Sequence, residues 1–501
     1  MKILFVYPQY PDTFWSFKHA LKFISKKAAF PPLGALTVAA MLPREWEKKL
    51  IDMNVDILID ADILWADYVF ISAMVVQKES TKETIQRCNN LGVKVVAGGP
   101  LFTTEPDAFN GVEHFVLNEA EVTLPLFLED LKAGNPRKTY STQIHPEITQ
   151  TPLPMWSLIN LKNYSSMNLQ YSRGCPFNCE FCDITFLDGQ NPRTKHKEQI
   201  LAEMDSLYNA GWRGDVFFVD DNFIGNKNKL KVEILPAIVE WMEKRKRPFN
   251  LFTEVSVNLA DDKELMHLMS RAGFNKVFVG IETPHEASLR ECDKKQNTKR
   301  DLIASVKTLQ NHGFEVMGGF IVGFDNDPAT IFETQINFIQ KSGIVTAMVG
   351  LLNAPKGTRL YQRLKGENRL LKESTGDNTD FSLDFTPKMK PEALINGYKE
   401  ILNTIYAPKH YYARIRTLLQ EYRPKTNYLK LQSKRSNLQG FFNCMWFMGL
   451  RENGRSYYWK LIASTLFTKP GSLPLLLALS VYGYHFRRVI KKYANNPAGL
   501  A

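Results

Sequence analysis

Short apolar segments alternate with longer segments of helical periodicity along the first 145 residues. The apolar segments are Ile3 to Tyr7, Lys49 to Met53, Tyr68 to Ala73, Val93 to Ala97 and His114 to Leu117, and helical patterns cover Leu33 to Leu42 and Ser80 to Leu91. Apolar segments this short, separated by helix-length stretches, predict a parallel, doubly wound (Rossmann-like) sheet. Ligands of such sheets bind at the carboxyl ends of the strands.

A second series of strand and helix patterns follows a proline-rich stretch. From Tyr140 to Asn163 the chain is rich in Ser, Thr, Gln and Pro, which disfavours regular structure. Strands are then predicted over Met167 to Ser172, Asp215 to Val219, Asn250 to Val255, Lys276 to Ile281, Val316 to Val322 and Thr346 to Leu351. The helices between them are predicted near Lys197 to Ala210, Lys229 to Lys244, Lys263 to Ala272, Arg300 to His312 and Ile331 to Gly343. Six such units predict a partial (β/α)6 barrel with its active site at the carboxyl ends of the strands.

The last part of the chain has a helical pattern throughout. We therefore expect a domain over residues 1–145, a linker over 146–163, a partial barrel over 164–358 and a helical C-terminal domain over 359–501. The segment Leu473 to Phe486 is apolar and is followed by four cations, Arg487, Arg488, Lys491 and Lys492. Two interpretations stay open for it: an amphipathic contact with a membrane surface, or a terminal helix packed on the barrel.

Composition and charge narrow the class of protein. With 44% hydrophobic and 12% aromatic residues, the 501-residue chain can bury substantial cores. A net charge of +11 suits nucleic acid, an anionic membrane or phosphorylated ligands, and equally a basic surface without a specific partner. No RNA-binding module is evident, so no nucleic-acid partner is expected. The start of the chain lacks a signal-peptide pattern, and no stretch reaches the roughly 18 apolar residues of a membrane span. We expect a cytoplasmic protein, with membrane association as the open alternative.

Three of the six cysteines fall within one twelve-residue segment, Tyr171 to Cys182. Cys175, Cys179 and Cys182 have the spacing C-x3-C-x2-C, and three thiolates on a four-iron cluster would leave the fourth iron open to a non-protein ligand. A structural zinc site needs four ligands, and no second cysteine pair is present. A disulfide framework is disfavoured in a long chain without a secretion signal. The spacing therefore favours an iron-sulfur cluster with one vacant position.

Polar and small residues follow the predicted strands of both units. In the first unit these are Met74, the pair Gly98 and Gly99, and Glu119. The glycines would let the backbone approach a bulky ligand, although a Gly-Gly-Pro turn is also common without any ligand. No G-x-G-x-x-G motif is present, which argues against a nicotinamide or flavin dinucleotide. In the barrel the strand-end residues are Asp220, Asp221, Asn222, Glu254, Ser256, Asn258, Glu282, Thr283, Gly323 and Asp325. Any one of these acids could instead cap a helix or hold a structural ion pair.

The segment R-G-C-P-F-N-C-E-F-C resembles the radical S-adenosylmethionine (SAM) superfamily. The resemblance implies that SAM chelates the fourth iron and that the reduced cluster cleaves it to a 5'-deoxyadenosyl radical. It places Glu254 and Ser256 at the SAM ribose and carboxylate. It assigns Gly280 to Glu282 to the family's fifth strand, near the SAM adenosine, and Gly319 to Asp325 to its G-x-I-x-G-x-x-E segment, with aspartate where glutamate is usual.

The first unit resembles the cobalamin-binding domain that precedes many radical SAM domains. The resemblance rests on Pro31-Pro32-Leu33-Gly34, the strand that ends at Met74, Gly98-Gly99-Pro100 and Glu119-Ala120-Glu121. The D-x-H-x-x-G motif that supplies a histidine to cobalt is absent. This implies either cobalamin without that histidine or a domain that has lost cobalamin.

Nearly the whole chain is similar to a subgroup with a helical C-terminal domain, which includes the hopanoid C-2 methylases. Stretches that carry the similarity are Thr13 to Phe17, Val219 to Asn226 and Ser256 to Ala260. The resemblance implies a C-methyltransferase that uses a [4Fe-4S] cluster, SAM and cobalamin, with an electron donor such as flavodoxin or ferredoxin. The substrate would be a lipid such as a hopanoid, a peptide or a small metabolite. Two alternatives stay open: a radical SAM enzyme of another reaction type, and a non-catalytic cobalamin or redox sensor.

Overall fold

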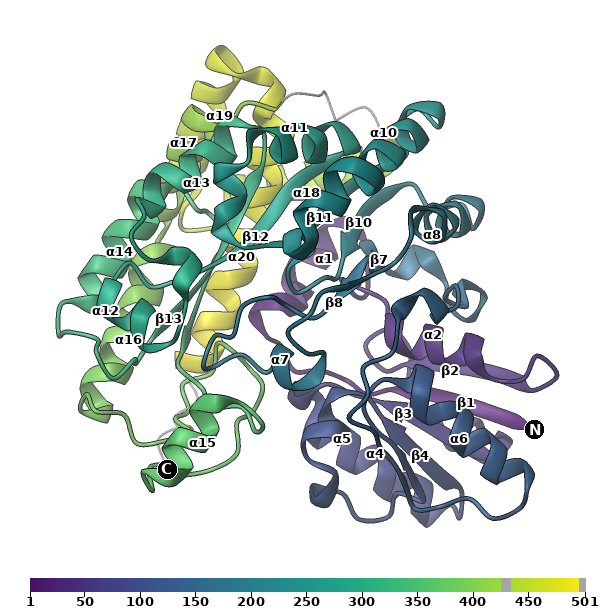
Figure 1. The fold of residues 1–501 in the computed structure, drawn as a ribbon. Helices are drawn as coiled ribbons and strands as arrows, with labels where there is room; N and C mark the ends of the chain where they lie inside the picture. The colour runs from purple at the N-terminus through teal and green to yellow at the C-terminus, as the bar shows by residue number, and fades with distance from the viewer. Residues whose placement is uncertain (425–433, 495–501) are drawn as a thin grey trace.

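Two six-stranded parallel sheets form the framework of the molecule (Figure 1). The computed structural model describes residues 1–424 and 434–494. The first sheet has the strand order β2-β1-β3-β4-β5-β6 and the second has the order β14-β13-β12-β11-β10-β7. A short antiparallel ribbon, β8 and β9, is inserted between the first two strands of the second sheet, β7 and β10.

The first sheet is doubly wound, as the sequence predicts. Its strands are β1 (Lys2–Tyr7), β2 (Glu47–Asp52), β3 (Tyr68–Ser72), β4 (Lys94–Gly98), β5 (His114–Val116) and β6 (Thr139–Tyr140). Successive residues of β1 enter different cores: Ile3 and Phe5 pack with α2 (Leu33–Met41) and α6 (Ala120–Lys132). Leu4 and Val6 pack with side chains of α3 (Asp60–Trp65), α4 (Lys78–Asn90) and α5 (Pro100–Thr104). Burial on both faces explains why β1 and β3 are almost continuously apolar.

The second sheet is the predicted partial barrel, with its strands in sequence order. They are β7 (Ser166–Leu169), β10 (Gly214–Phe218), β11 (Phe249–Val255), β12 (Phe274–Glu282), β13 (Glu315–Val322) and β14 (Ala347–Leu351). Helices cover its outer face (Figure 1): α8 (Lys197–Asn209), α9 (Lys227–Lys229), a π-helical turn η9 (Leu230–Ile234), α10 (Leu235–Lys244), α11 (Lys263–Ala272), α12 (Glu286–Glu291), α13 (Leu302–Asn311) and α14 (Ile331–Ser342).

Two details of the barrel differ from the sequence predictions. The strand predicted over Met167 to Ser172 stops at Leu169, because the Asp220 carboxylate accepts the backbone N–H groups of Tyr171 and Ser172. The chain then forms β8 (Ser172–Arg173), which pairs with β9 (Arg193–Thr194). The segment Gly280 to Glu282 ends β12, which is the fourth strand counted from β7 and not the fifth.

The C-terminal region consists mainly of helices and shares the core of the barrel. Its helices are α15 (Arg359–Gly366), α16 (Pro391–Tyr406), α17 (Pro408–Glu421), α18 (Lys434–Trp446), the π-helical turn η13 (Phe447–Arg451), α19 (Arg455–Thr468) and α20 (Leu473–Ala494). One continuous hydrophobic cluster contains Val279 of the barrel, Tyr398 of α16, Phe486 of α20 and Phe14 near the N-terminus. The predicted helical pattern over 425–433 and 495–501 lies outside the described residues.

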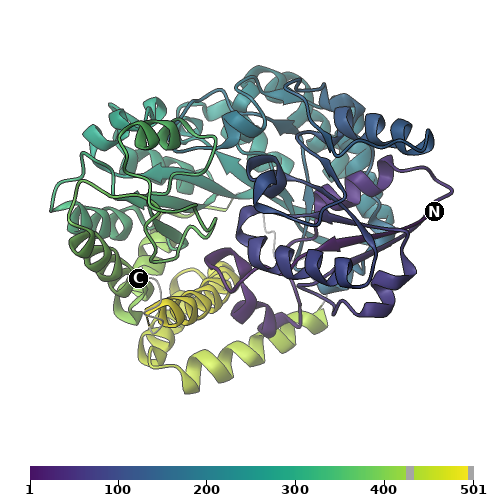
Figure 2. The same ribbon diagram turned by 90° about the horizontal axis from the view of Figure 1, so that it is seen from below.

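The segment Leu473 to Phe486 is a buried helix in this structure. Leu476, Leu479 and Phe486 are inaccessible to solvent, and the Phe486 ring stacks on Phe14 with 4.0 Å between centroids. Of the two interpretations of this segment, packing against the rest of the protein is the one the fold adopts. In the described part of the chain, no helix combines the length and apolar character needed to cross a bilayer. Figure 2 shows the yellow and yellow-green C-terminal helices along one side of the molecule.

Candidate active site

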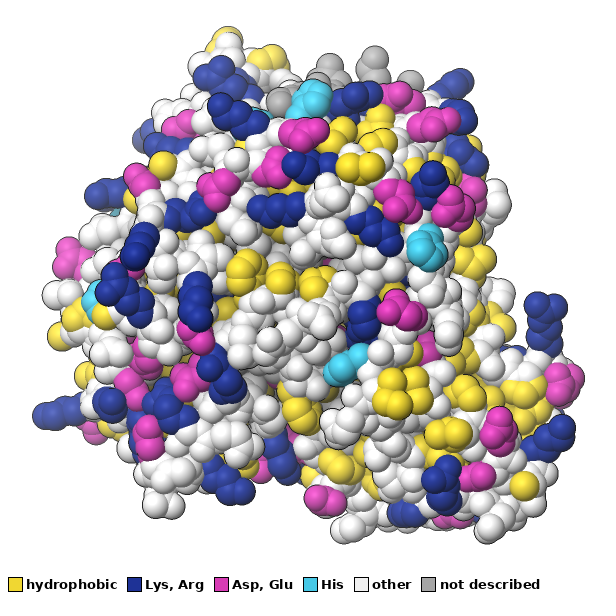
Figure 3. Space-filling model, in the orientation of Figure 1, with side chains coloured by type: hydrophobic (Ala, Val, Ile, Leu, Met, Phe, Trp, Pro, Cys, Tyr) yellow, Lys and Arg dark blue, Asp and Glu magenta, His cyan; other side chains and the backbone are white. Residues whose placement is uncertain are grey.

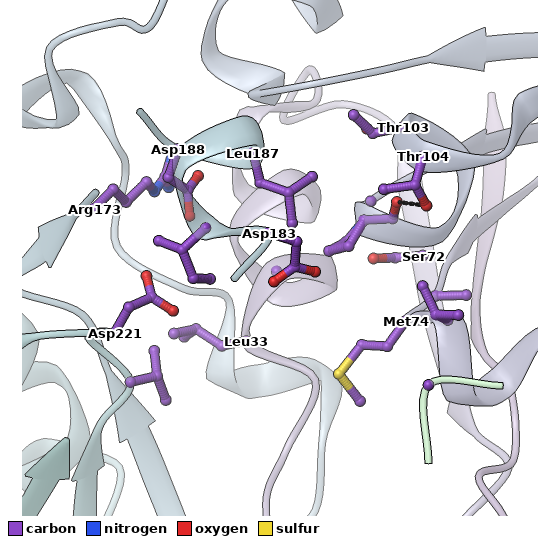
Figure 4. Close-up of a pocket in the computed structure, with 18 of the residues that line it drawn as sticks. Leu33, Ser72, Met74, Thr103, Thr104, Arg173, Asp183, Leu187, Asp188 and Asp221 are labelled. Carbon is purple, nitrogen blue, oxygen red and sulfur yellow. Dashed lines mark hydrogen bonds between the residues drawn. The ribbon is translucent and has the colours of Figure 1, made fainter. Parts of the chain in front are cut away.

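A cavity of about 970 Å³ lies where the carboxyl ends of the two sheets meet. Residues from both units line it, and Figure 4 shows side chains of the first unit, such as Met74, and of the barrel, such as Asp221, reaching toward the same space. Eight of the predicted site residues line the cavity: Met74, Gly98, Gly99, Glu119, Cys182, Asp221, Glu254 and Glu282. The carboxyl edges of both sheets therefore face one cavity, and ligands of parallel sheets bind at that edge.

The cysteine segment lies beside this cavity. Cys179 is buried, whereas Cys175 and Cys182 are half-buried. The segment turns at Gly174, whose φ of +89° and close approach to the backbone oxygens of Gly189 and Asn191 leave no room for a side chain. Asn222 Nδ2 lies 3.8 Å from Cys175 Sγ, and Gln296 Nε2 lies 3.9 Å from Cys179 Sγ. Amide donors directed at sulfur are typical of protein surroundings that tune iron-sulfur clusters.

The donor set suits a multi-iron cluster better than a single ion. Among residues 1–424 and 434–494, no three His, Cys, Asp or Glu side chains converge closely enough to hold one metal ion. A cubane cluster spreads its thiolates over different irons, so three separated thiols of this kind fit it. Burial raises the pKa of each of the three thiols. Cationic iron would offset the free-energy cost of forming buried thiolates, because thiolate is the form that binds metal.

Lys294 is a half-buried cation beside the cysteines that the sequence analysis did not identify. Its Nζ lies 2.6 Å from Glu282 Oε1. The same Nζ lies over the Phe181 ring, 6.0 Å from the ring centroid. Burial acts to lower the pKa of Lys294, but Glu282 and Cys179 raise it by more, so the side chain stays charged. Lys294 follows α12 in a loop without a recognisable motif, so no sequence signal pointed to it.

Glu282 occupies a strained backbone position. Its φ is +63°, in the left-handed region, and the register of β12 against β13 shifts between Gly280 and Glu282. A bulge of this kind re-aims a side chain, and a non-glycine residue with positive φ is a frequent feature of functional sites. On the neighbouring strand end, burial raises the pKa of Glu254 to about 7.

The two adjacent aspartates at the end of β10 have different surroundings. Asp220 is fully buried and holds the cysteine segment through Ser172 Oγ, at 2.6 Å, and through two backbone N–H groups. Asp221 points into the cavity with Asp183 and Asp188 (Figure 4). Burial, together with the Asp188 and Glu254 carboxylates, raises the pKa of Asp221 well above its usual value.

Of the ten predicted strand-end residues of the barrel, seven do not line the shared cavity: Asp220, Asn222, Ser256, Asn258, Thr283, Gly323 and Asp325. The Ser256 backbone N–H donates to Asn222 Oδ1 at 3.2 Å, and Ser256 lines a smaller cavity of about 390 Å³ behind the cysteine segment. Gly323 adopts a φ of +108° and donates its N–H to Asp327. The Asp325 carboxylate is held by Arg363 and Arg369, so it is a structural ion-pair partner.

Glu119 belongs to an ion-pair network that joins the two units. Arg173 Nη1 lies 2.8 Å from Glu119, and Arg173 Nη2 lies 2.8 Å from Glu121. Arg193 and His145 also contact Glu119, at 2.8 and 2.9 Å. Burial acts to raise the pKa of Glu121, but Arg173 lowers it to about 2. The arginine that precedes Gly174 and Cys175 thus binds the Glu119-Ala120-Glu121 segment of the first unit.

The Gly98-Gly99 turn gives the cavity a backbone wall. A Cβ atom on Gly98 would lie 2.7 Å from the backbone oxygen of Val116, and Gly99 has a φ of +91°. Local packing and backbone conformation therefore favour glycine at both positions. Both glycines border the cavity, as do Ser72 and Thr103 (Figure 4). No histidine is among the described residues that line this cavity. A large cavity with a glycine wall has room for a cofactor as bulky as cobalamin.

Comparisons with known proteins match the three parts of the chain. Residues 24–128 match the B12 binding domain, residues 169–338 the radical SAM superfamily, and residues 358–498 a domain of unknown function, DUF4070. An uncharacterised methyltransferase of Synechocystis is 40% identical over 97% of this chain and 91% of its own length. A hopanoid C-2 methylase of Rhodopseudomonas palustris is 32% identical over 97% of this chain and 92% of its own length.

Solved structures show the same fold at low sequence identity. The cobalamin-dependent SAM radical enzyme OxsB, with aqua-cobalamin bound, superimposes with a TM-score of 0.64 at 14% identity, covering 100% of this chain and 81% of that one. The radical SAM methyltransferase TsrM of Kitasatospora setae, with cobalamin and a [4Fe-4S] cluster bound, gives 0.64 at 14% identity and covers 99% and 100%.

Proposed function

Because this chain belongs to the family of radical SAM enzymes with a B12-binding domain, we propose that it methylates an unactivated carbon of a lipid substrate. The observation that carries this proposal is the single cavity bordered both by Cys182 and by the Gly98-Gly99 turn. The cluster supplies the electron that cleaves SAM, and cobalamin supplies the methyl group. Cys182 and the Gly98-Gly99 turn would hold these groups at one cavity.

Named side chains would divide this task. Cys175, Cys179 and Cys182 would hold the cluster. The side-chain N–H of Asn222 would point at the Cys175 sulfur, while its Oδ1 accepts the backbone N–H of Ser256. Glu254 and Glu282 would contact SAM, and Lys294 would hold the Glu282 carboxylate in position beside the cluster. Gly323 would act indirectly, through the turn that ends β13. These roles follow from the resemblance to radical SAM enzymes, and the contacts of the named side chains are compatible with them.

A lipid of the hopanoid type is the substrate that the relatives and the cavity favour. The hopanoid C-2 methylase relative aligns along nearly its whole length, including the C-terminal region. The cavity lining is largely apolar and includes Leu33, Met41, Met74 and Phe278. A hydrocarbon substrate would be bound mainly by such surface. We further propose a flavodoxin or ferredoxin as electron donor and domain limits of 1–145, 146–163, 164–358 and 359–501.

Cofactor loading is the first test. The protein would be purified without oxygen, reconstituted with iron, sulfide and hydroxocobalamin, and freed of unbound cofactor. We expect the spectrum to contain both an iron-sulfur band and stoichiometric cobalamin. Cys175→Ala should lose the cluster and all formation of 5'-deoxyadenosine, whereas the buried Cys88→Ala in the first unit should keep both. A cluster without cobalamin would contradict the proposed methylation.

Substrate identity needs a separate measurement. The loaded enzyme, a reductant and SAM with a deuterated methyl group would be incubated with a hopanoid. We expect 5'-deoxyadenosine, S-adenosylhomocysteine and a lipid heavier by one deuterated methyl group. Formation of the two nucleoside products with a peptide or small metabolite, but not with hopanoid, would contradict the lipid assignment and retain the methyltransferase.

A further inference from the structure

The helices α18 and α19, joined by η13, expose large apolar side chains on the side that faces away from the core. Phe442, Trp446 and Leu450 are 65%, 52% and 56% exposed. They follow one another at intervals of four residues, so they lie on one side of the helix, opposite the buried Cys444 and Met448. A helix on the surface of a soluble protein normally has polar residues on that side.

The apolar surface continues onto α19. Trp459 is 41% exposed, and its indole N–H donates to the backbone oxygen of Gly449, which places it next to Leu450. Farther along α19, Leu466 and Phe467 are 49% and 91% exposed. We call these six residues the aromatic surface: Phe442, Trp446, Leu450, Trp459, Leu466 and Phe467. Concentrations of exposed aromatic and aliphatic residues of this kind mark interaction sites.

The charged residues around the aromatic surface are almost all basic. Between residues 440 and 469 the cations are Arg451, Arg455, Lys460 and Lys469, and the one carboxylate is Glu452. Glu452 is paired with Arg487 of α20 at 3.4 Å. The guanidinium of Arg451 lies over the Trp446 ring at 5.4 Å, so a cation and an aromatic ring occur together at this surface. By contrast, basic and acidic side chains are interspersed on the face drawn in Figure 3.

We propose that the aromatic surface binds the surface of an anionic lipid bilayer, with Arg451, Arg455 and Lys460 at the level of the headgroups. Tryptophan and phenylalanine at the acyl boundary, with cations beside them, are the features by which helices bind in the plane of a membrane. Each cation near an anionic bilayer adds electrostatic attraction to the headgroups. This inference does not depend on the identity of the substrate, because it rests on exposure and charge outside the cavity.

A second copy of the chain is a less suitable occupant. A twofold interface brings the same surface of both copies together, so it would bring these three cations of one copy toward those of the other. An anionic bilayer complements both the apolar and the basic residues. The membrane contact therefore lies on α18 and α19, and not on the Leu473 to Phe486 segment that the sequence suggested, because α20 is buried.

Flotation of the loaded enzyme with lipid vesicles tests the proposal. The probes are vesicles of phosphatidylcholine alone and vesicles containing about one third phosphatidylglycerol, which carry a negative surface potential. We expect the wild-type enzyme to float with the anionic vesicles and not with the neutral ones. Added salt should reduce binding, because it screens the exposed cations. Failure of the wild type to bind anionic vesicles would overturn the proposal.

Matched variants locate the binding surface. The triple variant Phe442→Ser, Trp446→Ser, Leu450→Ser should lower the bound fraction at least about tenfold, because it removes most of the buried apolar contact. The control triple Ile57→Ser, Leu64→Ser, Val232→Ser removes equally exposed apolar residues elsewhere and should bind as the wild type does. Equal binding by both triples would overturn the proposal.

Charge and oligomeric state complete the test. Arg455→Glu with Lys460→Glu should abolish the preference for anionic vesicles, whereas the exposed pair Arg44→Glu with Lys341→Glu should preserve it. Light scattering that finds a dimer of the wild type and a monomer of the aromatic triple would assign the surface to self-association and overturn the proposal. Methylation of detergent-dispersed substrate should be equal in all variants, so failure of membrane binding and failure of the proposed function are distinguishable.

Discussion

At the scale of single residues, Arg173 connects the cysteine segment to the first sheet. Its guanidinium binds Glu119 and Glu121 at 2.8 Å each, and all three side chains are largely buried. A planar guanidinium can bind two carboxylates at once, which a lysine cannot do with the same geometry. The position of Cys175, two residues later, therefore depends on residues of the other unit.

Replacement of Arg173 is expected to destabilise the protein strongly. Arg173→Ala leaves buried carboxylates without their main cation, which typically costs about 3–5 kcal/mol of unfolding free energy. Arg173→Lys should fall between the alanine variant and the wild type. Chemical denaturation followed by circular dichroism measures the effect, with the exposed Arg44→Ala as control. Equal stability of Arg173→Ala and Arg44→Ala would show that the network contributes little.

At the scale of elements, α20 holds a buried histidine against the N-terminal segment. His485 is inaccessible to solvent, and its Nε2 lies 3.0 Å from the backbone oxygen of Phe14. His19 packs against it with 5.6 Å between ring centroids. Burial lowers the pKa of His485 to about 4, from 6.5. A neutral histidine is thus part of the contact between α20 and the start of the chain.

This contact should weaken as the pH falls. The unfolded chain binds a proton at His485 near pH 6.5, whereas the folded protein resists protonation until about pH 4. The contribution of neutral His485 to the free energy of unfolding is complete above pH 6.5. It is lost as the pH falls from 6.5 to 4, by roughly 3 kcal/mol in total.

The difference between variants isolates this effect from other groups that titrate. Thermal unfolding would be followed from pH 7 to about pH 4, the range in which the linkage acts. We expect the midpoint of His485→Gln to fall less steeply with pH than that of the wild type. The exposed His267→Gln should follow the wild type. Parallel curves for all three proteins would contradict the assignment to His485.

At the scale of the whole molecule, the two ends of the chain form one core. Phe14 stacks on Phe486, and Trp15 donates its indole N–H to Met348 Sδ of β14 at 3.1 Å. The same hydrophobic cluster runs through the barrel and through α16, α17 and α20. The N-terminal segment and the last helix therefore stabilise the barrel, although they are about 470 residues apart.

Removal of the Phe486 ring should reveal this coupling. Phe486→Ala creates a cavity in the shared core and is expected to cost about 3–5 kcal/mol of unfolding free energy. Phe467→Ala on the adjacent helix is the matched control, because that ring is 91% exposed and its loss should cost little. Urea denaturation of the two variants measures the difference. Similar stabilities would mean that α20 is not part of the common core.

Local patterns in the sequence determined the two sheets, the residues at their carboxyl edges and the cysteine segment. Strand and helix periodicity is a property of neighbouring residues, so β1 and β10 to β14 were predicted to within a few positions. The spacing of Cys175, Cys179 and Cys182 is equally local. Strand ends were correct for Asp221, Glu254 and Glu282 because the carboxyl edge of a parallel sheet follows from chain direction alone.

Tertiary structure alone decided which of these residues reach the cavity and what surrounds them. Asp220 and Asp325 have the same chemistry as Asp221, but partners distant in the sequence, Ser172 and Arg369, bind them elsewhere. Lys294 lies beside the cysteines, and α20 is buried, because contacts across many residues set their positions. Burial and ion pairing depend on the whole packed chain, whereas periodicity and spacing depend on a few consecutive residues. For that reason the sequence determined the chemistry, and the fold determined its arrangement.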